Sequence, residues 1–202
     1  MQEASKRLAE EAERRKDFYK DYDDVKVEFI NGEVIVHSPA KVKHLECVNN
    51  IAELMSIYAK INKNGTICKE KAMISLVRND YMPDIVYFNN QQSATITKDQ
   101  WQFDAPSLIV EVLSDSTRST DRGIKWRDYA KAGVMEYWIV DADEETVEQF
   151  ILTDDNSFDL HIKAQTGMIR SSAIHGFEIP IRACFDAVEN LKEHVRIVEK
   201  YK

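Results

Sequence analysis

PSLIVEVLSDSTRSTDRGIKWRDYAKAGVMEYWIVD, residues 106–141, contains the pattern that predicts the architecture of this chain most clearly. Residues 108–113 form a nearly continuous apolar run, which is typical of a strand buried on both faces. A helical pattern follows from about residue 121 to 132 and ends at Gly133, and the next apolar run is EYWIVD. This strand–helix–strand order predicts two parallel neighbouring strands joined by a helix that covers one face of a sheet.

The segments on either side predict that the remaining strands are antiparallel. Asn31–Gly32 separates the alternating segments VKVEFI and EVIVHS, and this dipeptide is a strong hairpin signal. TVEQFIL and FDLHIKA predict a second hairpin. The predicted fold class is therefore α/β in its α+β variety: a mixed β-sheet flanked by helices, with antiparallel hairpins. Further strands are expected at about 66–77, 84–88 and 176–179.

Helices are expected at residues 1–22, 41–63, near 98–101 and at the C-terminus. Gly65 is expected to end the second of them. The apolar face of that helix is predicted to contain Leu45, Val48, Ala52, Met55 and Ala59. The apolar side of the C-terminal helix is predicted to contain Phe185, Val188, Leu191, Val195 and Val198.

Length and composition indicate one globular domain. The chain has 202 residues, of which 44% are hydrophobic, and only six glycines and four prolines. We expect an N-terminal helical extension at 1–24 and the domain itself at 25–202. No run is long enough to span a membrane, and no secretory signal is visible. Three widely spaced cysteines indicate reduced thiols, so a cytoplasmic location is expected.

The net charge of −8 argues against a nucleic-acid partner, but the charges are unevenly distributed. Residues 141–160 contain eight acidic residues and no lysine or arginine, so this segment alone carries as much negative charge as the net charge of the chain. Residues 118–131 contain five basic residues against two acidic ones, directly after the central apolar strand. The plain interpretation of each run is a solvated face, more strongly for the acidic run, because the position of the basic run also favours a functional surface.

Two carboxylates lie in unusually apolar surroundings. Glu111 stands in the middle of the strand at 108–113, and Asp84 begins the apolar segment DIVYF after Pro83. A buried carboxylate without a partner destabilises the fold by several kcal/mol or changes its pKa, so each needs a compensating group. Magnesium takes one or two carboxylates together with water and phosphate oxygens. If their strands are neighbours, Asp84 and Glu111 can therefore form a site that hydrolyses phosphodiesters.

These residues resemble a known pattern. Pro83–Asp84, followed by Glu111, Val112 and Leu113, is similar to the PD-(D/E)XK motif of the restriction-endonuclease-like superfamily. The stretches FINGEVIVHSP, PDIVYF and the block 108–141 resemble more specifically the putative restriction endonuclease domain family. The resemblance covers about residues 25–190 and implies a restriction-endonuclease-like fold.

One position departs from the superfamily motif. Its lysine is expected two positions after Glu111, where this chain has Leu113. In the family that the chain resembles, the lysine is supplied by the following helix, which corresponds to Lys125. The resemblance then implies that Asp84 and Glu111 bind Mg²⁺, with Mn²⁺ as a substitute, and that the Val112 carbonyl is a third ligand. Lys125 would orient the attacking water.

His44 and Glu33 correspond to accessory residues of the family. His44 lies at the edge of the apolar stripe of its helix, and Glu33 follows the hairpin turn. The resemblance implies that His44 contacts the metal site or the phosphate. A packed structural histidine, and a glutamate that keeps the hairpin soluble, are equally consistent with the sequence.

The three main candidates also have structural interpretations. Glu111 and Lys125 can form a buried ion pair without catalysis. Asp84 can have a role at the start of its strand, since aspartate is common in such places. Lys125 can pair with Asp121 one helical turn earlier, which stabilises a surface helix by only a few tenths of a kcal/mol.

The sequence thus supports two hypotheses for function. The first is a Mg²⁺-dependent endonuclease that hydrolyses phosphodiester bonds in DNA, acting as a homodimer because cleavage of a duplex needs two active sites. The second is a catalytically silent, nuclease-like scaffold that binds nucleic acid or a protein partner. The overall acidity and Leu113 favour the second hypothesis, whereas Asp84, Glu111 and Lys125 favour the first.

Overall fold

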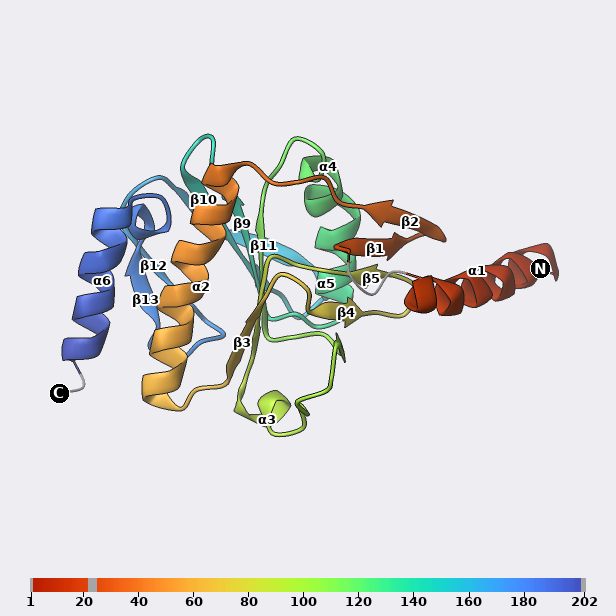
Figure 1. Ribbon diagram of the computed structural model, residues 1–202, viewed down its shortest axis with the longest axis horizontal. Coiled ribbons are helices and arrows are strands. Elements are labelled where there is room, and N and C mark those ends of the chain that lie inside the picture. Colours follow the sequence, from red (N-terminus) through yellow and green to blue (C-terminus); the bar gives the residue numbers. More distant parts are fainter. Residues whose placement is uncertain (1, 22–24, 201–202) are drawn as a thin grey trace.

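The computed structural model of the protein describes residues 2–21 and 25–200, and its centre is a six-stranded sheet (Figure 1). The strands run, from one edge to the other, in the order β11 (Phe158–Ala164), β10 (Thr146–Leu152), β9 (Glu136–Asp141), β8 (Leu108–Val112), β6 (Ile85–Phe88) and β3 (Thr66–Lys69).

The strand–helix–strand unit predicted from residues 106–141 is confirmed. β8 and β9 are parallel neighbours, with Leu108 opposite Glu136 and Val112 opposite Val140. The connection between them contains α4 (Arg118–Thr120), the π-helical turn η1 (Asp121–Lys125) and α5 (Trp126–Lys131). All other neighbours in this sheet are antiparallel, including the predicted hairpin of β10 and β11. The sheet is therefore mixed, as expected.

Helices cover both faces of this sheet (Figure 1). Helices α2 (Val42–Asn62) and α6 (Ala187–Glu199) pack on one face, together with the 3-10 turn η2 (Ile181–Cys184) and the hairpin of β12 (Met168–Arg170) and β13 (Glu178–Pro180). The core on this side includes Leu108, Val110 and Val112 of the central strand. Helix α5 packs on the other face, where Ile109 and Leu113 meet Tyr129. Glu111 also points to the α5 face, because strand side chains alternate.

A second, smaller sheet lies beside α5. Its strands are β2 (Glu33–Val36), β1 (Val27–Ile30), β5 (Asp80–Tyr81), β4 (Met73–Ser75) and β7 (Gln102–Phe103). The predicted hairpin of β1 and β2 turns at Asn31 and Gly32, whose φ angles of 52° and 86° are both positive, as a type I′ turn requires. This sheet brings two further charged residues to the central strand, namely Glu28 of β1 and Lys26, which directly precedes β1.

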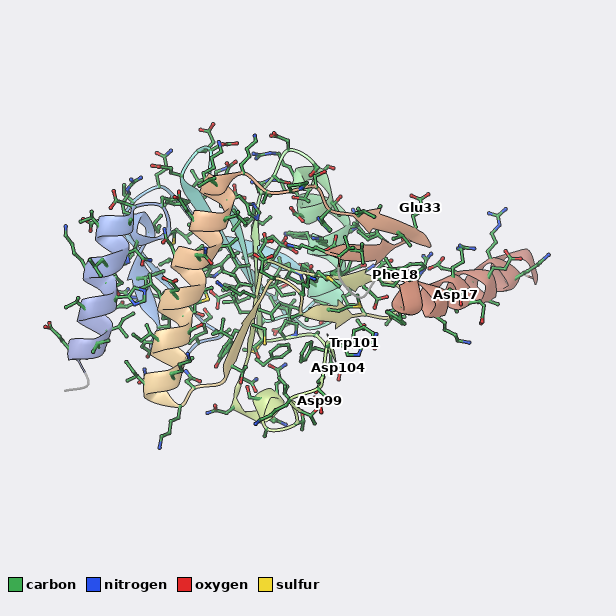
Figure 2. The ribbon with its side chains drawn as sticks, viewed as in Figure 1. Asp17, Phe18, Glu33, Asp99, Trp101 and Asp104 are labelled. Atoms are coloured by element: carbon green, nitrogen blue, oxygen red, sulfur yellow. The ribbon has the colours of Figure 1, made fainter. Side chains whose placement is uncertain are left out.

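Helix α1 (Gln2–Asp21) projects from the body and is attached at its inner end (Figure 1). Arg15 donates two hydrogen bonds of 2.5 and 2.6 Å to the buried carboxylate of Asp80, and the Tyr19 hydroxyl donates a third. Phe18 packs against Phe29 of β1 (Figure 2 shows it at the inner end of the helix). The division into an extension at 1–24 and a domain at 25–202 stays a prediction.

The predicted helix near 98–101 is wrong. The helix of this connection is α3 (Asn90–Ser93), where the side chains of Asn89 and Gln92 form a capping box. The segment 66–77 contains two strands, β3 and β4, rather than one. Helix α2 ends with Lys63 in the left-handed conformation, so Gly65 does not end it. Gly65 is needed because a Cβ there would lie 2.1 Å from the carbonyl oxygen of Phe88.

Three residues of the predicted apolar side of the C-terminal helix, Val188, Leu191 and Val195, face solvent in α6, whereas Phe185 precedes the helix and packs against the core. Val188 and Leu191 are 63% and 65% exposed, whereas Asn190, Glu193 and Ile197 are buried. The reason is visible at Asn190, whose amide donates to the backbone carbonyls of Asn50 and Ala183 and so fixes the rotation of the helix. Leu45, at the start of α2, is also exposed, because it lies outside the part of the helix that packs on the sheet.

Glu136 is a fully buried carboxylate that is satisfied by neutral donors. Trp138 Nε1 and Gln149 Nε2 donate to Oε1 at 2.6 Å, and Ser171 Oγ and the Ala173 amide donate to Oε2 at 2.7 and 2.8 Å. These bonds hold the segment after β12 against the sheet.

Replacing Glu136 by glutamine is expected to lower the free energy of unfolding by about 2 kcal/mol, because the new amide would face a donor in a buried site. Urea denaturation measures the change. Glu178→Gln is the control, since Glu178 is partly exposed and its one ion pair, with Arg170, lies on the surface. Equal stability of the two variants would contradict the role assigned to Glu136.

Candidate active site

Asp84 and Glu111 lie next to each other on neighbouring strands. Ile85 of β6 pairs with Val110 of β8 in antiparallel register, so the residue before Ile85 stands opposite the residue after Val110. Both side chains are buried, with 3% exposure each. The Val112 amide donates a hydrogen bond of 2.8 Å to Asp84 Oδ2, which fixes this carboxylate against the end of β8.

Glu111 is held from the α5 side by two donors. Lys125 Nζ and the Tyr129 hydroxyl donate to Glu111 Oε1 at 3.0 and 2.9 Å. Lys125 is the last residue of the π-helical turn, and such turns are frequent at functional sites. Glu111 Oε2 has no hydrogen bond with any residue in the described part of the chain. Glu111 also lines a pocket.

Lys125 is surrounded by three carboxylates. Its Nζ lies 2.9 Å from Glu28 Oε1, 3.0 Å from Glu111 Oε1 and 3.1 Å from Asp121 Oδ1. Glu28, from β1, also accepts a hydrogen bond from the Met82 amide, and its other oxygen lies 3.1 Å from His37 Nε2. The Lys125 side chain is only 1% exposed. This cluster joins the small sheet, the π-helical turn and the central strand.

The crowding of negative charge changes the pKa values of these groups. Burial, together with the charges of Asp121, Asp84 and Glu28, raises the pKa of Glu111 to about 8, although Lys125 acts in the opposite direction. Burial likewise raises the pKa of Asp121. For Glu28, burial is outweighed by Lys125 and His37, which lower its pKa to about 2.

A pocket of about 560 Å³ opens over Asp84 and Glu111. Lys26, just before β1, reaches into it, and its Nζ donates to Asp84 Oδ1 at 2.6 Å. His44, in the first turn of α2, places Nε2 at 3.6 Å from the same oxygen. Burial works against an ionised Asp84, but His44 and Lys26 outweigh it and hold the pKa of this carboxyl well below its usual range.

The rim of the pocket is formed by the start of α2 and the loop after β8. Lys41 pairs with Asp115 at 3.0 Å, and Lys43 pairs with Asp143. Ser114, Ser116 and Thr117 of the loop after β8 also line the pocket. The rim therefore offers ammonium groups and hydroxyl groups above a carboxylate floor.

Most of the residues expected from the sequence meet in this pocket. Asp84, Glu111, Val112, Lys125 and His44 all line it. Glu33 does not, since it lies exposed at the tip of the β1–β2 hairpin and points away from the body (Figure 2).

Lys26, Glu28 and His37 belong to the site although they were not expected there. Glu28 carries the signal that marked Glu111, namely a carboxylate between apolar residues of a strand, Val27 and Phe29. No sequence pattern marks Lys26 or His37, because both reach the site only through the position of the small sheet beside the large one.

Comparison with solved structures defines the class of fold. The chain is similar to the crystal structure of a putative nuclease belonging to DUF820 from Anabaena variabilis, with a TM-score of 0.71 and 18% identity over 83% of this chain and 94% of that one. The fold is therefore restriction-endonuclease-like. The type IIG restriction endonuclease BpuSI also matches 83% of this chain, over 17% of its own length, with 14% identity and a TM-score of only 0.41.

The family follows from the sequence itself. The model of the Uma2 family, described as putative restriction endonuclease, matches residues 9–182, and the chain belongs to this family. The resemblance inferred from residues 25–190 is thereby confirmed. No curated protein matches the chain. In the described part of the chain, no helix combines the length and the apolar character that crossing a membrane requires. The cytoplasmic location stays a prediction.

Proposed function

We propose that this chain is a divalent-metal-dependent endonuclease that hydrolyses phosphodiester bonds in DNA. The observation that carries this proposal is the convergence of Asp84 and Glu111, from neighbouring strands, on the floor of one pocket. The membership in a nuclease family and the nuclease-like fold support it.

The charge of the site favours a divalent cation. Four buried carboxyl groups meet here (Glu28, Asp84, Glu111 and Asp121) beside two ammonium groups (Lys26 and Lys125), so the fully ionised site would carry two negative charges in excess without counting the histidines. The raised pKa of Glu111 reflects this crowding of charge, which a divalent cation would relieve. Within residues 2–21 and 25–200, no group of three His, Cys, Asp or Glu side chains is arranged to hold a metal. Mg²⁺ needs fewer, since it often binds one or two carboxylates and completes its shell with water.

We assign the ligand positions to Asp84, to Glu111 through its open Oε2, and to the Val112 carbonyl, with Mg²⁺ as the natural ion and Mn²⁺ as a substitute. The chemistry that such an ion supplies is polarisation of the phosphoryl oxygen and activation of water. Lys125 and Tyr129 then act as positioning residues, because they hold Glu111 through Oε1 and leave its other oxygen without a partner among the described residues. This assignment replaces the water-orienting role that the resemblance implied for Lys125.

The substrate is proposed to be DNA, in agreement with the family description. The net charge of −8 does not oppose this, because the rim of the pocket brings Lys41 and Lys43 to the place where a phosphate backbone would approach. Cleavage of both strands needs two active sites, so the homodimer stays a prediction.

The test is cleavage of supercoiled plasmid by the wild-type chain with Mg²⁺, with Mn²⁺ and with EDTA. We expect nicked or linear product with either metal and none with EDTA. Titration calorimetry with Mn²⁺ accompanies the assay for wild type and for Asp84→Asn, and we expect heat of binding only for the wild type.

The possible outcomes distinguish the metal-dependent endonuclease from the catalytically silent scaffold. Cleavage that persists in EDTA would contradict metal dependence. A wild-type chain that binds neither Mn²⁺ nor plasmid would contradict the proposal altogether. Binding of plasmid without cleavage and without Mn²⁺ binding would instead identify the silent scaffold.

A further inference from the structure

The motif lysine of this fold class has no counterpart on β8, where Leu113 is buried among apolar side chains. The lysine of the following helix does not replace it at the open side of the pocket. An ammonium group has three N–H donors. The ammonium group of Lys125 lies within about 3 Å of carboxylate oxygens from Glu28, Glu111 and Asp121 and donates a hydrogen bond to Glu111. Because this side chain is only 1% exposed, its ammonium group is enclosed by the carboxylates rather than open to a ligand.

Lys26 has the opposite arrangement. Its ammonium has one partner among the described residues, Asp84 Oδ1 at 2.6 Å, and its side chain is 24% exposed. Two of its three N–H donors are therefore available on the pocket side. Its backbone is fixed, because the His37 amide donates to the Lys26 carbonyl at 3.1 Å where the β1–β2 hairpin ends.

The other cations of the pocket are less suited to contact a group that sits on Asp84 and Glu111. Lys41 and Lys43 lie on the rim, and each pairs with an acidic residue there. Among the described residues, only Lys26 combines an ammonium group in direct contact with a carboxylate of the pocket floor and N–H donors without a partner.

We propose that Lys26 binds the substrate phosphate in this site, because among the described residues it is the ammonium group that contacts the pocket floor and keeps donors available for phosphate oxygens. This inference rests on the proposed function and adds to it a substrate-binding residue supplied from outside the PD…ExL motif. In the absence of substrate, the contact with Asp84 keeps the ammonium group in place. A phosphate oxygen in the pocket would accept from the two remaining donors.

The test measures binding rather than cleavage. Wild type and Lys26→Ala are titrated into a short fluorescein-labelled DNA duplex in Ca²⁺ buffer without Mg²⁺, at several salt concentrations. Each phosphate contact contributes about 0.9 to the slope of log affinity against log salt concentration. We expect Lys26→Ala to bind more weakly and to lose about that much slope, and Lys26→Arg to keep the slope.

The matched control is Lys163→Ala, because Lys163 also pairs with a single carboxylate, Glu148 at 2.8 Å, but lies on β11 outside the pocket. Its slope should equal that of the wild type. An unchanged slope in Lys26→Ala, or an equal loss in the control, would overturn the assignment. Absence of duplex binding by the wild type would overturn it as well. If the wild type binds the duplex but does not cleave plasmid, the nuclease proposal is contradicted. The role of Lys26 in phosphate binding is then still judged from the salt dependence of Lys26→Ala.

Discussion

Glu111→Gln is expected to reduce metal-dependent cleavage at least about a hundredfold, because metal-based charge stabilisation contributes several kcal/mol and the amide removes a ligand charge. The same substitution should leave the fold intact. Since burial and neighbouring carboxylates raise the pKa of Glu111 to about 8, a neutral side chain of equal size suits the site at least as well as the charged one. The rate of cleavage should therefore fall, whereas the free energy of unfolding should not.

This difference separates a catalytic Glu111 from a purely structural one. Plasmid cleavage and urea denaturation at pH 8 are measured on the same preparation. Glu148→Gln is the matched control, because Glu148 is also a buried strand carboxylate but is paired with Arg122 and Lys163 outside the pocket. It should keep activity. Full cleavage by Glu111→Gln, or a loss of stability that accounts for its inactivity, would contradict the proposed role.

Lys125→Met is expected to lower the free energy of unfolding by about 3 to 5 kcal/mol, the range found when one partner of a buried ion pair is removed. Methionine fills a similar volume, so the effect is that of charge. Three buried carboxylates would lose the ammonium group that lies within about 3 Å of each. Urea denaturation at pH 7 measures the change.

The pH dependence of the stability of Lys125→Met shows whether uncompensated carboxylates cause the loss. Without Lys125 the folded-state pKa values of Glu111 and Asp121 should rise further above their unfolded values, and the lowered pKa of Glu28 should rise as well. A group with a raised pKa stabilises the fold fully below its unfolded pKa of about 4 and loses that contribution as the pH rises through its folded value. Since Glu111 already has a pKa of about 8 beside Lys125, the deficit should be small near pH 5 and large near pH 8.

Two further variants control this result. Lys163→Met removes a lysine whose side chain is 58% exposed, so it should change stability by less than about 1 kcal/mol. Adding Glu111→Gln to Lys125→Met should restore part of the lost stability, because it removes one of the uncompensated charges. If Lys125→Met were as stable as the wild type at pH 8, the carboxylate cluster would have to be neutralised in another way.

The sequence determined the parts of this protein that depend on local pattern. The alternation and turn chemistry around Asn31–Gly32 predicted the first hairpin, and the apolar runs of residues 106–141 predicted the parallel pair. Glu111 was identifiable because a carboxylate within an apolar strand has to be compensated. The same local reasoning failed for α6, where the apolar stripe faces solvent and Asn190 turns inward to satisfy two backbone carbonyls.

The packing of the two sheets sets which charged side chains lie close together. Lys26 and Glu28 are separated by about eighty residues or more from Glu111, and they reach it because the small sheet packs beside the π-helical turn. The pairing of Lys125 with three carboxylates, and the open donors of Lys26, depend on that packing. Electrostatic interactions are set by distances in space and by burial, and neither quantity is encoded in the spacing of residues along the chain. The sequence thus determined the fold class and its central acids, whereas the packing of the two sheets determined which lysine is enclosed and which faces the pocket.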